Sequence, residues 1–119
     1  MTTKTKSNDA TRVVEQYFSH MRAADISVAD LFHEDAVLLG LGMRTQGREA
    51  IRTFYTQSIA TGSPQPRLAA PLLSEGERVA AEIYIDLADG STVHVVDMFR
   101  VEDGMIRSLN YFVADEPAA

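Results

Sequence analysis

The amino-acid sequence predicts an α+β domain in which N-terminal helices pack on one face of a curved sheet. Apolar residues recur at helical spacing in the first half of the chain, whereas they alternate as in strands from Arg67 onward. Two dipeptides that favour tight hairpins, Asp89-Gly90 and Asp103-Gly104, separate the later strands. Helices followed by an antiparallel meander of strands are typical of this fold class.

The first helix is expected to begin near Asn8 or Asp9, because either side chain can accept hydrogen bonds from the free amides of a helix N-terminus. Residues 1–8 are polar and lack periodicity, so they are predicted to form a disordered arm before a single domain over residues 9–115. The apolar face of this helix is expected to comprise Val13, Val14, Tyr17 and Met21.

A polar break over residues 25–30 follows, and Ser27 is a possible cap for a short helix over residues 28–32. The apolar run at 36–39 predicts a strand, which ends in the glycine-rich turn at 40–42.

A third helix is expected to begin after Gly47 and to end at Gly62-Ser63-Pro64, because glycine and proline stop helices. The remaining chain reads as β structure. Its strands are predicted over residues 68–73, 78–87, 92–101 and 105–113.

The composition is that of one soluble globular domain. The chain has 119 residues, 45% of them hydrophobic and 24% charged. Its net charge of −6 disfavours nucleic acid and anionic membranes as partners. There is no cysteine, so disulfides and thiolate metal sites are excluded, and the histidines lack a ligand spacing such as H-E-x-x-H. The N-terminus lacks the apolar stretch of a signal peptide, and a cytoplasmic protein is expected.

The strand around Asp97 is the most informative one, because a single carboxylate interrupts an apolar face. Successive side chains of a strand point to opposite faces, so Asp97 shares its face with Val93, Val95, Phe99 and Val101. A buried carboxylate without a partner is costly and its pKa is raised, so that it can donate a proton near neutral pH. Alternatively, this face is only half buried and Asp97 reaches water.

The hairpin at Asp89-Gly90 decides which residues lie beside Asp97. A two-residue loop pairs Glu82 with Asp97 and brings two carboxylates together, which would split their pKa values. A three-residue loop over residues 88–90, with a glycine bulge, shifts the register by one and pairs Ala81 with Asp97. The second register is favoured, because it makes the inner face consistently apolar.

The segment V-V-D-M-F-R-V-E-D-G-M-I-R-S-L-N-Y-F resembles the last hairpin of the nuclear-transport-factor-2-like superfamily. The segments G-R-E-A-I-R-T-F-Y and L-F-H-E-D-A-V fit the same superfamily, and the resemblance covers about residues 10–115. In pattern, the chain is most similar to ketosteroid isomerases and SnoaL-like polyketide cyclases. The resemblance implies a cone, with helices that close one side of a strongly curved, mixed and mostly antiparallel sheet around an apolar pocket.

Specific residues match the site of these enzymes. In ketosteroid isomerases, a tyrosine of the first helix and a protonated aspartic acid of a late strand bind the substrate oxygen. The resemblance places these roles on Tyr17 and Asp97, and a second tyrosine that hydrogen-bonds the first on Tyr55. The position of the isomerases' general base falls on Gly40, and glycine has no side chain that can accept a proton. The resemblance to SnoaL-like cyclases implies that Asp97 alone acts as acid and base in an intramolecular aldol closure.

Other interpretations of the same fold remain open. Limonene-epoxide hydrolases use an arginine and two aspartates, which fall on Ile83, Ile85 and Tyr111, so epoxide hydrolysis is not expected. Tyr17 and Tyr55 could also be core tyrosines whose hydroxyl groups find backbone partners. The chain is then an isomerase-like or cyclase-like enzyme, a ligand-binding module without turnover, or an assembly domain.

The resemblance also implies the ligand and the oligomeric state. A small hydrophobic ligand is expected without a cofactor or metal, in a pocket lined by Val13, Met21, Phe54, Ile83, Ile85, Val95, Phe99, Leu109, Tyr111 and Val113. An exposed apolar patch usually marks an interface, and a two-fold homodimer is expected through the outer face of the sheet. That patch comprises Val96, Met98, Ile106 and Phe112.

Overall fold

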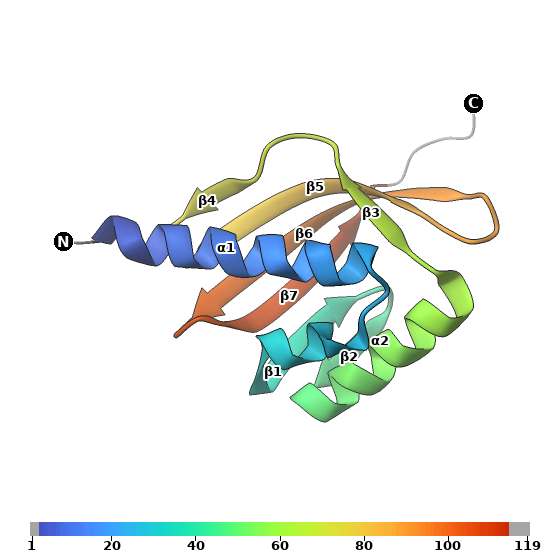
Figure 1. Cartoon of the computed structure of the whole chain (residues 1–119), viewed down its shortest axis with the longest axis horizontal. Coiled ribbons are helices and arrows are strands. Elements are labelled where there is room, and N and C mark those ends of the chain that lie inside the picture. Colours follow the sequence, from blue (N-terminus) through green and yellow to red (C-terminus); the bar gives the residue numbers. More distant parts are fainter. Residues whose placement is uncertain (1–2, 115–119) are drawn as a thin grey trace.

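The computed structural model describes residues 3–114, which form two helices and one 3-10 helix packed on a curved, unclosed sheet (Figure 1). The α+β prediction is therefore confirmed. The elements in chain order are α1 (Thr3–Arg22), η1 (Ile26–Leu31), β1 (Phe32–Gly40), β2 (Met43–Gln46), α2 (Arg48–Gly62), β3 (Gln65–Leu68), β4 (Leu73–Glu75), β5 (Arg78–Asp86), β6 (Thr92–Glu102) and β7 (Met105–Val113).

The seven strands form one mixed sheet with the order β2-β1-β7-β6-β5-β3, in which β4 also pairs with β5. Strands β1 and β7 run parallel, and the other pairs are antiparallel. Helix α1 crosses in front of the long strands, whereas α2 lies beside β1 and β2 (Figure 1). The core lies between these helices and the inner face of the sheet. No helix within the described range is long and apolar enough to cross a membrane.

Helix α1 begins earlier than predicted. It starts at Thr3 rather than near Asn8 or Asp9, so residues 3–8 belong to the helix and not to a disordered arm, while residues 1–2 lie outside the described range. Once a helix is anchored by buried residues, each further residue adds a hydrogen bond without new nucleation, so a polar segment can extend it. The predicted apolar face is buried, and it comprises Val13, Val14, Tyr17 and Met21.

The first half of the chain differs from the prediction in two further details. The short helix is the 3-10 helix η1, which is capped by Asp25 rather than by Ser27, and Phe32 already belongs to β1. Strand β2 was not predicted, because its side chains are mostly exposed and show no alternation of buried residues.

The predicted strand over residues 68–73 is also wrong, since the chain leaves the sheet after Leu68 and returns at Leu73. Pro71 lies in this gap and has no backbone N–H to donate to a neighbouring strand. The third helix agrees with the prediction, because α2 follows Gly47 and ends at Gly62, with Ser63 as a left-handed C-cap.

The register of the β5–β6 hairpin is the favoured one. Ala81 lies opposite Asp97, and Leu87 and Ser91 close a three-residue loop through the hydrogen bond from the Leu87 amide to the Ser91 carbonyl. Gly90 adopts a positive φ of 89° in this loop, as a glycine bulge requires. Glu82 therefore faces outward and does not share the face of Asp97.

The predicted outer patch is wrong for Ile106, which is fully buried. The β6–β7 register shifts so that Arg100 pairs with Ser108 while Val101 pairs with Ile106, which leaves one extra residue in β7. This bulge turns Ile106 from the outer face to the core. Of the other expected members, Val96 and Met98 are half-buried, and Phe112 is 57% exposed.

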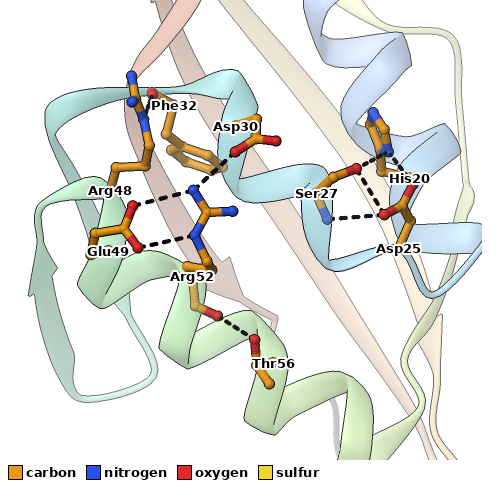
Figure 2. A network of polar contacts seen from close by, with 9 residues as sticks. All are labelled: His20, Asp25, Ser27, Asp30, Phe32, Arg48, Glu49, Arg52 and Thr56. Atoms are coloured by element: carbon orange, nitrogen blue, oxygen red, sulfur yellow. Dashed lines mark hydrogen bonds and ion pairs between the residues drawn. The ribbon is translucent and has the colours of Figure 1, made fainter.

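A set of polar side chains, here called the helix clasp, joins α1, η1 and α2 (Figure 2). The Asp25 carboxylate accepts hydrogen bonds from the Ser27 amide at 2.9 Å and the Ser27 hydroxyl at 2.7 Å, and it contacts His20 Nδ1 at 3.0 Å. Arg52 donates to Asp30 at 2.9 Å and to Glu49 at 3.1 Å. The seven clasp residues are His20, Asp25, Ser27, Asp30, Arg48, Glu49 and Arg52.

The clasp also reaches the sheet, since Arg48 Nε donates to the Phe32 carbonyl oxygen at 2.8 Å (Figure 2). These contacts join the two helices to each other through η1 and to the start of β1.

Candidate active site

A largely apolar cavity of about 200 Å³ lies between the helices and the inner face of the sheet. Among the described residues that line it, Asp97 is the sole ionisable group other than tyrosine, and there is no lysine, arginine or histidine. The lining residues are Tyr17, Phe18, Met21, Leu41, Phe54, Tyr55, Ser58, Pro64, Pro66, Ile83, Ile85, Leu87, Val93, Val95, Asp97 and Tyr111.

Asp97 projects from the middle of β6, between Ala81 of β5 and Tyr111 of β7. Its side chain is buried, with 1% of the residue exposed, and its Oδ1 atom has no hydrogen-bond partner within residues 3–114. Desolvation disfavours the charged carboxylate and raises the pKa of Asp97 well above its usual range. Burial therefore favours the protonated form of Asp97, which can donate a proton into the cavity, and an exposure of 1% contradicts the alternative of a half-buried Asp97.

Three tyrosine hydroxyl groups meet in the same cavity, and we call this arrangement the tyrosine triangle. The oxygen atoms of Tyr17 and Tyr55 are 2.8 Å apart, those of Tyr17 and Tyr111 are 3.1 Å apart, and those of Tyr55 and Tyr111 are 2.5 Å apart. Burial is the largest cause that raises the pKa of each of these hydroxyl groups above the usual value. All three are consequently neutral phenols that can donate hydrogen bonds at physiological pH.

Helix, strand and aromatic packing hold the triangle in place. Tyr17 comes from α1, Tyr55 from α2 and Tyr111 from β7, three elements that are far apart in the sequence. The ring of Tyr17 contacts the rings of Phe99 and Tyr55 edge-on, with centroids 5.1 and 6.1 Å apart. Edge-to-face packing of this kind fixes the orientation of an aromatic ring, so the Tyr17 hydroxyl is directed without a backbone partner.

Gly40 lies directly against Tyr111. It has a φ of +136°, and a Cβ atom at this position would stand 2.7 Å from the Cβ and 2.8 Å from the carbonyl oxygen of Tyr111. Atoms that are not bonded do not approach so closely in an unstrained core. The position onto which the isomerase base falls therefore has no room for a side chain.

The structure brings the predicted site residues Asp97, Tyr17 and Tyr55 into one cavity. Of the predicted pocket residues, six line it: Met21, Phe54, Ile83, Ile85, Val95 and Tyr111. Three are buried in the core without lining the cavity, and these are Val13, Phe99 and Leu109.

The prediction for Val113 is wrong, because it lies at the end of β7 and is 48% exposed. Several lining residues were missed. The strand alternation that singles out Val95 also places Val93 on the inner face, so this residue could have been found. Leu41, Pro64 and Pro66 approach the cavity from turns or short segments, and no periodicity predicts their positions.

The three histidines lie away from the cavity. His20 belongs to the helix clasp, His33 Nε2 is 2.9 Å from the Glu102 carbonyl oxygen, and His94 is stacked on Tyr84 on the outer face. Within the described part of the chain, no group of three or more histidine and carboxylate side chains could hold a metal ion.

Comparison with known proteins agrees with the fold. A family model described as a SnoaL-like domain matches residues 14–109. No curated protein matches the chain.

Several solved structures have a similar fold. A protein provisionally assigned as a ketosteroid isomerase from Kribbella flavida is 22% identical, with a TM-score of 0.82 over 96% of this chain and 85% of that chain. A protein provisionally assigned as a polyketide cyclase from Sinorhizobium meliloti is 23% identical, with a TM-score of 0.77 over 85% of this chain and 94% of that chain.

An LEH-like epoxide hydrolase from M. tuberculosis is 19% identical, with a TM-score of 0.81 over 91% of this chain and 84% of that chain. At such low identity, these likenesses show the fold alone.

Proposed function

The chain belongs to the SnoaL-like family, and we propose that it is an enzyme that stabilises an enol or enolate of a small carbonyl-bearing ring substrate. The reaction is an aldol-type cyclisation or an isomerisation, with Asp97 as the acid and Tyr17, supported by Tyr55, as the donor to the substrate oxygen. One observation carries this proposal: Asp97 lines an apolar cavity, and its buried Oδ1 atom has no hydrogen-bond partner among residues 3–114. Such an atom is costly unless a ligand satisfies it.

The apolar walls favour a ligand with a flat hydrocarbon body, and the polar groups accept its oxygen. A carbonyl oxygen that gains negative charge is stabilised by donors that are already in place and shielded from water. We propose Asp97 and Tyr17 as these donors, because burial raises the pKa of each and so favours the protonated form that donates.

A single carboxyl group suffices for the cyclisation. The substrate enters as the enol tautomer of its activated methylene group, which forms in water without the enzyme. The enol carbon attacks a second carbonyl carbon of the same molecule, and a carbon–carbon bond forms as the carbonyl π bond breaks. Asp97 gives its proton to the new alkoxide oxygen, and its carboxylate takes the proton that the enol hydroxyl loses. The acid is regenerated, and no second base is required.

An isomerisation places a greater demand on the same site. It moves a proton between two carbon atoms, and a positioned base typically supplies a rate factor of about 10²–10⁴. Among the described residues that line the cavity, Asp97 carries the one carboxyl group, and position 40 has no room for another. The cyclase function is therefore the better supported of the two.

A ligand-binding module without turnover is the second candidate. The lack of a base at Gly40 favours it, because the donors of the cavity would bind an oxygen atom equally well without any reaction.

Binding of phenols tests the shared part of both candidates, since an ionised phenol mimics an enolate. The probes are 2-naphthol and the phenolic steroid equilenin, followed by their fluorescence in the parent protein, Asp97→Asn and Tyr17→Phe. We expect micromolar binding of at least one probe, weakened about ten-fold or more by each substitution. Tyr84→Phe on the outer face is the matched control and leaves binding unchanged.

Binding that is indifferent to both substitutions contradicts the proposal. Turnover then separates its two forms. Cyclisation of a substrate with an activated methylene, or isomerisation of a β,γ-unsaturated ketone, identifies an enzyme, and tight binding without either reaction identifies a binding module.

A further inference from the structure

We propose that Tyr111 is a second direct donor to the ligand, whose oxygen atom binds between the Tyr17 and Tyr111 hydroxyls beside Asp97. This inference rests on the proposed function of the cavity. It assigns a catalytic contact to a residue of the last strand, and it makes Tyr55 a positioning residue behind the other two.

The number of protons in the tyrosine triangle implies that one of its hydrogen bonds must break before it can donate a hydrogen bond to a ligand. Three hydroxyl groups carry three protons, and the three oxygen–oxygen contacts are all short enough to be hydrogen bonds. A closed ring of donors uses every proton internally. The triangle can therefore donate a hydrogen bond to a ligand oxygen only when at least one of these internal bonds is broken.

The contact between Tyr17 and Tyr111 is the one that opens most easily. Its oxygen atoms are 3.1 Å apart, against 2.8 and 2.5 Å for the two contacts of Tyr55. Longer hydrogen bonds between hydroxyl groups are weaker. Tyr55 takes part in both of the shorter contacts, so it stays behind its neighbours, and Tyr17 and Tyr111 are the two hydroxyls that turn toward a ligand.

Strand pairing places the same edge of the triangle beside the acid. Tyr111 lies directly opposite Asp97 in the β6–β7 register. Residues paired in this way have their side chains on one face, with Cβ atoms about 4.5–5.5 Å apart. Under this proposal, a ligand oxygen at this edge is bound by three donors, which are Tyr17, Tyr111 and Asp97.

Gly40 lies directly beside the backbone of Tyr111. A Cβ atom at position 40 would be 2.7 Å from the Cβ and 2.8 Å from the carbonyl oxygen of Tyr111, atoms that nearly every residue type would place there. The position onto which the isomerase base falls therefore stays a glycine, and in the proposed site the hydroxyl of Tyr111 supplies a donor to the ligand.

The test compares Tyr111→Phe with Tyr17→Phe, Tyr55→Phe and the outer-face control Tyr84→Phe in the full-length protein. Each variant is titrated with 2-naphthol, with ring-substituted 2-naphthols of graded acidity, and with naphthalene. We expect Tyr111→Phe to weaken 2-naphthol binding about ten-fold, as Tyr17→Phe does. The affinity of Tyr111→Phe for the naphthols should also depend less on their acidity than the affinity of the parent protein does. Naphthalene should bind to this variant as tightly as to the parent protein.

Naphthalene separates a hydrogen bond from packing, because it fills the same volume without an oxygen atom. A second measurement does not depend on any substitution. In the parent complex with 2-naphthol, NMR should show a downfield hydroxyl proton resonance that the free protein lacks, with nuclear Overhauser effects both to the ring of Tyr111 and to the ring of the naphthol.

The outcomes are distinct. If Tyr111→Phe binds 2-naphthol within about two-fold of the parent protein while Tyr17→Phe loses about ten-fold, Tyr111 is only a cavity wall and this inference is wrong. Equal loss of 2-naphthol and naphthalene in Tyr111→Phe also overturns it, because the effect is then packing. If the parent protein binds no phenol, or if Asp97→Asn and Tyr17→Phe bind like the parent, the proposed function itself fails.

Discussion

The helix clasp and the cavity each contain an aspartate, and the two aspartates have opposite environments. In the clasp, Asp25 accepts two hydrogen bonds from Ser27 and contacts His20, and the bonds from Ser27 are the largest cause that lowers its pKa (Figure 2). In the cavity, Asp97 has an Oδ1 atom without a partner among the described residues, and burial raises its pKa. The carboxylate of Asp25 has hydrogen-bond partners within the protein, whereas the carboxyl group of Asp97 is available to a ligand.

The hydrogen-bond partners of these side chains, and not their residue types, distinguish the clasp from the candidate active site. His20, Asp25 and Ser27 are the residue types of a hydrolytic triad, but the Ser27 hydroxyl and the Asp25 carboxylate both approach the same nitrogen, His20 Nδ1, at 3.4 and 3.0 Å. A triad needs them on different nitrogens. These residues cap η1, whereas the less conspicuous set of one acid and three phenols shares an apolar cavity.

The largest expected effect concerns Gly40, at the wall of the cavity. Gly40→Ala should destabilise the protein by about 3 kcal/mol, because the added methyl group is forced against Tyr111 and overpacking costs on that order. Gly40→Asp should be at least as damaging and should not create an isomerase. Urea unfolding of the purified variants measures the loss.

Gly42 provides the matched control, because its φ is also positive but nothing lies within 4 Å of an added Cβ. Gly42→Ala should cost only about 1–2 kcal/mol of backbone strain. If the two alanine variants are equally stable, the close contact between Gly40 and Tyr111 does not exist in solution.

The second expected effect concerns stability against pH, because Asp97 and Asp25 change the free energy of unfolding in opposite directions as the pH rises. Because the pKa of Asp97 is raised in the folded state, the folded protein holds this proton more tightly than the unfolded chain. Its contribution to stability is complete below the usual value of 3.8 and is lost as the pH rises through the raised pKa. Asparagine does not titrate, so Asp97→Asn lacks this loss. The stability of the variant relative to the parent protein should therefore increase as the pH rises.

Asp25→Asn should behave in the opposite way. The lowered pKa of Asp25 stabilises the folded state above the usual value of 3.8, and this contribution disappears as the pH falls through the lowered pKa. The variant should therefore be less stable than the parent at neutral pH and should approach it in acid. Chemical unfolding of both variants from acid to neutral pH checks the signs, and parallel curves would show that the environments of the two aspartates do not differ.

Much of the cavity follows from the sequence because strands carry a simple alternation. The apolar face around Asp97 predicts its burial, and the demand for one apolar inner face selects the register that pairs it with Ala81. The helical spacing of apolar residues likewise places Tyr17 on the buried face of α1. These inferences depend on local periodicity and on the resemblance to a family, and both are present in the chain itself.

The remaining features depend on contacts between distant segments. The bulge that buries Ile106 changes no local pattern that a sequence displays. Tyr111 appears in the sequence as one aromatic residue of an apolar strand, and its place in the triangle becomes visible once α1, α2 and β7 are assembled. The glycine at position 40 indicates a missing base, but only the approach of Tyr111 explains why no side chain fits.

The smallest expected effect concerns the clasp. Arg52→Met removes the contacts with Asp30 and Glu49 while keeping the length of the side chain. Both partners are largely exposed, and exposed ion pairs contribute little and are screened by salt. The thermal midpoint should therefore fall slightly at low ionic strength and match that of the parent protein in high salt. Binding of 2-naphthol should stay within about two-fold of the parent, because Tyr55 is held by buried contacts and not by Arg52. A ten-fold loss of binding would instead mean that the clasp positions the tyrosine triangle, and that the two regions act as one.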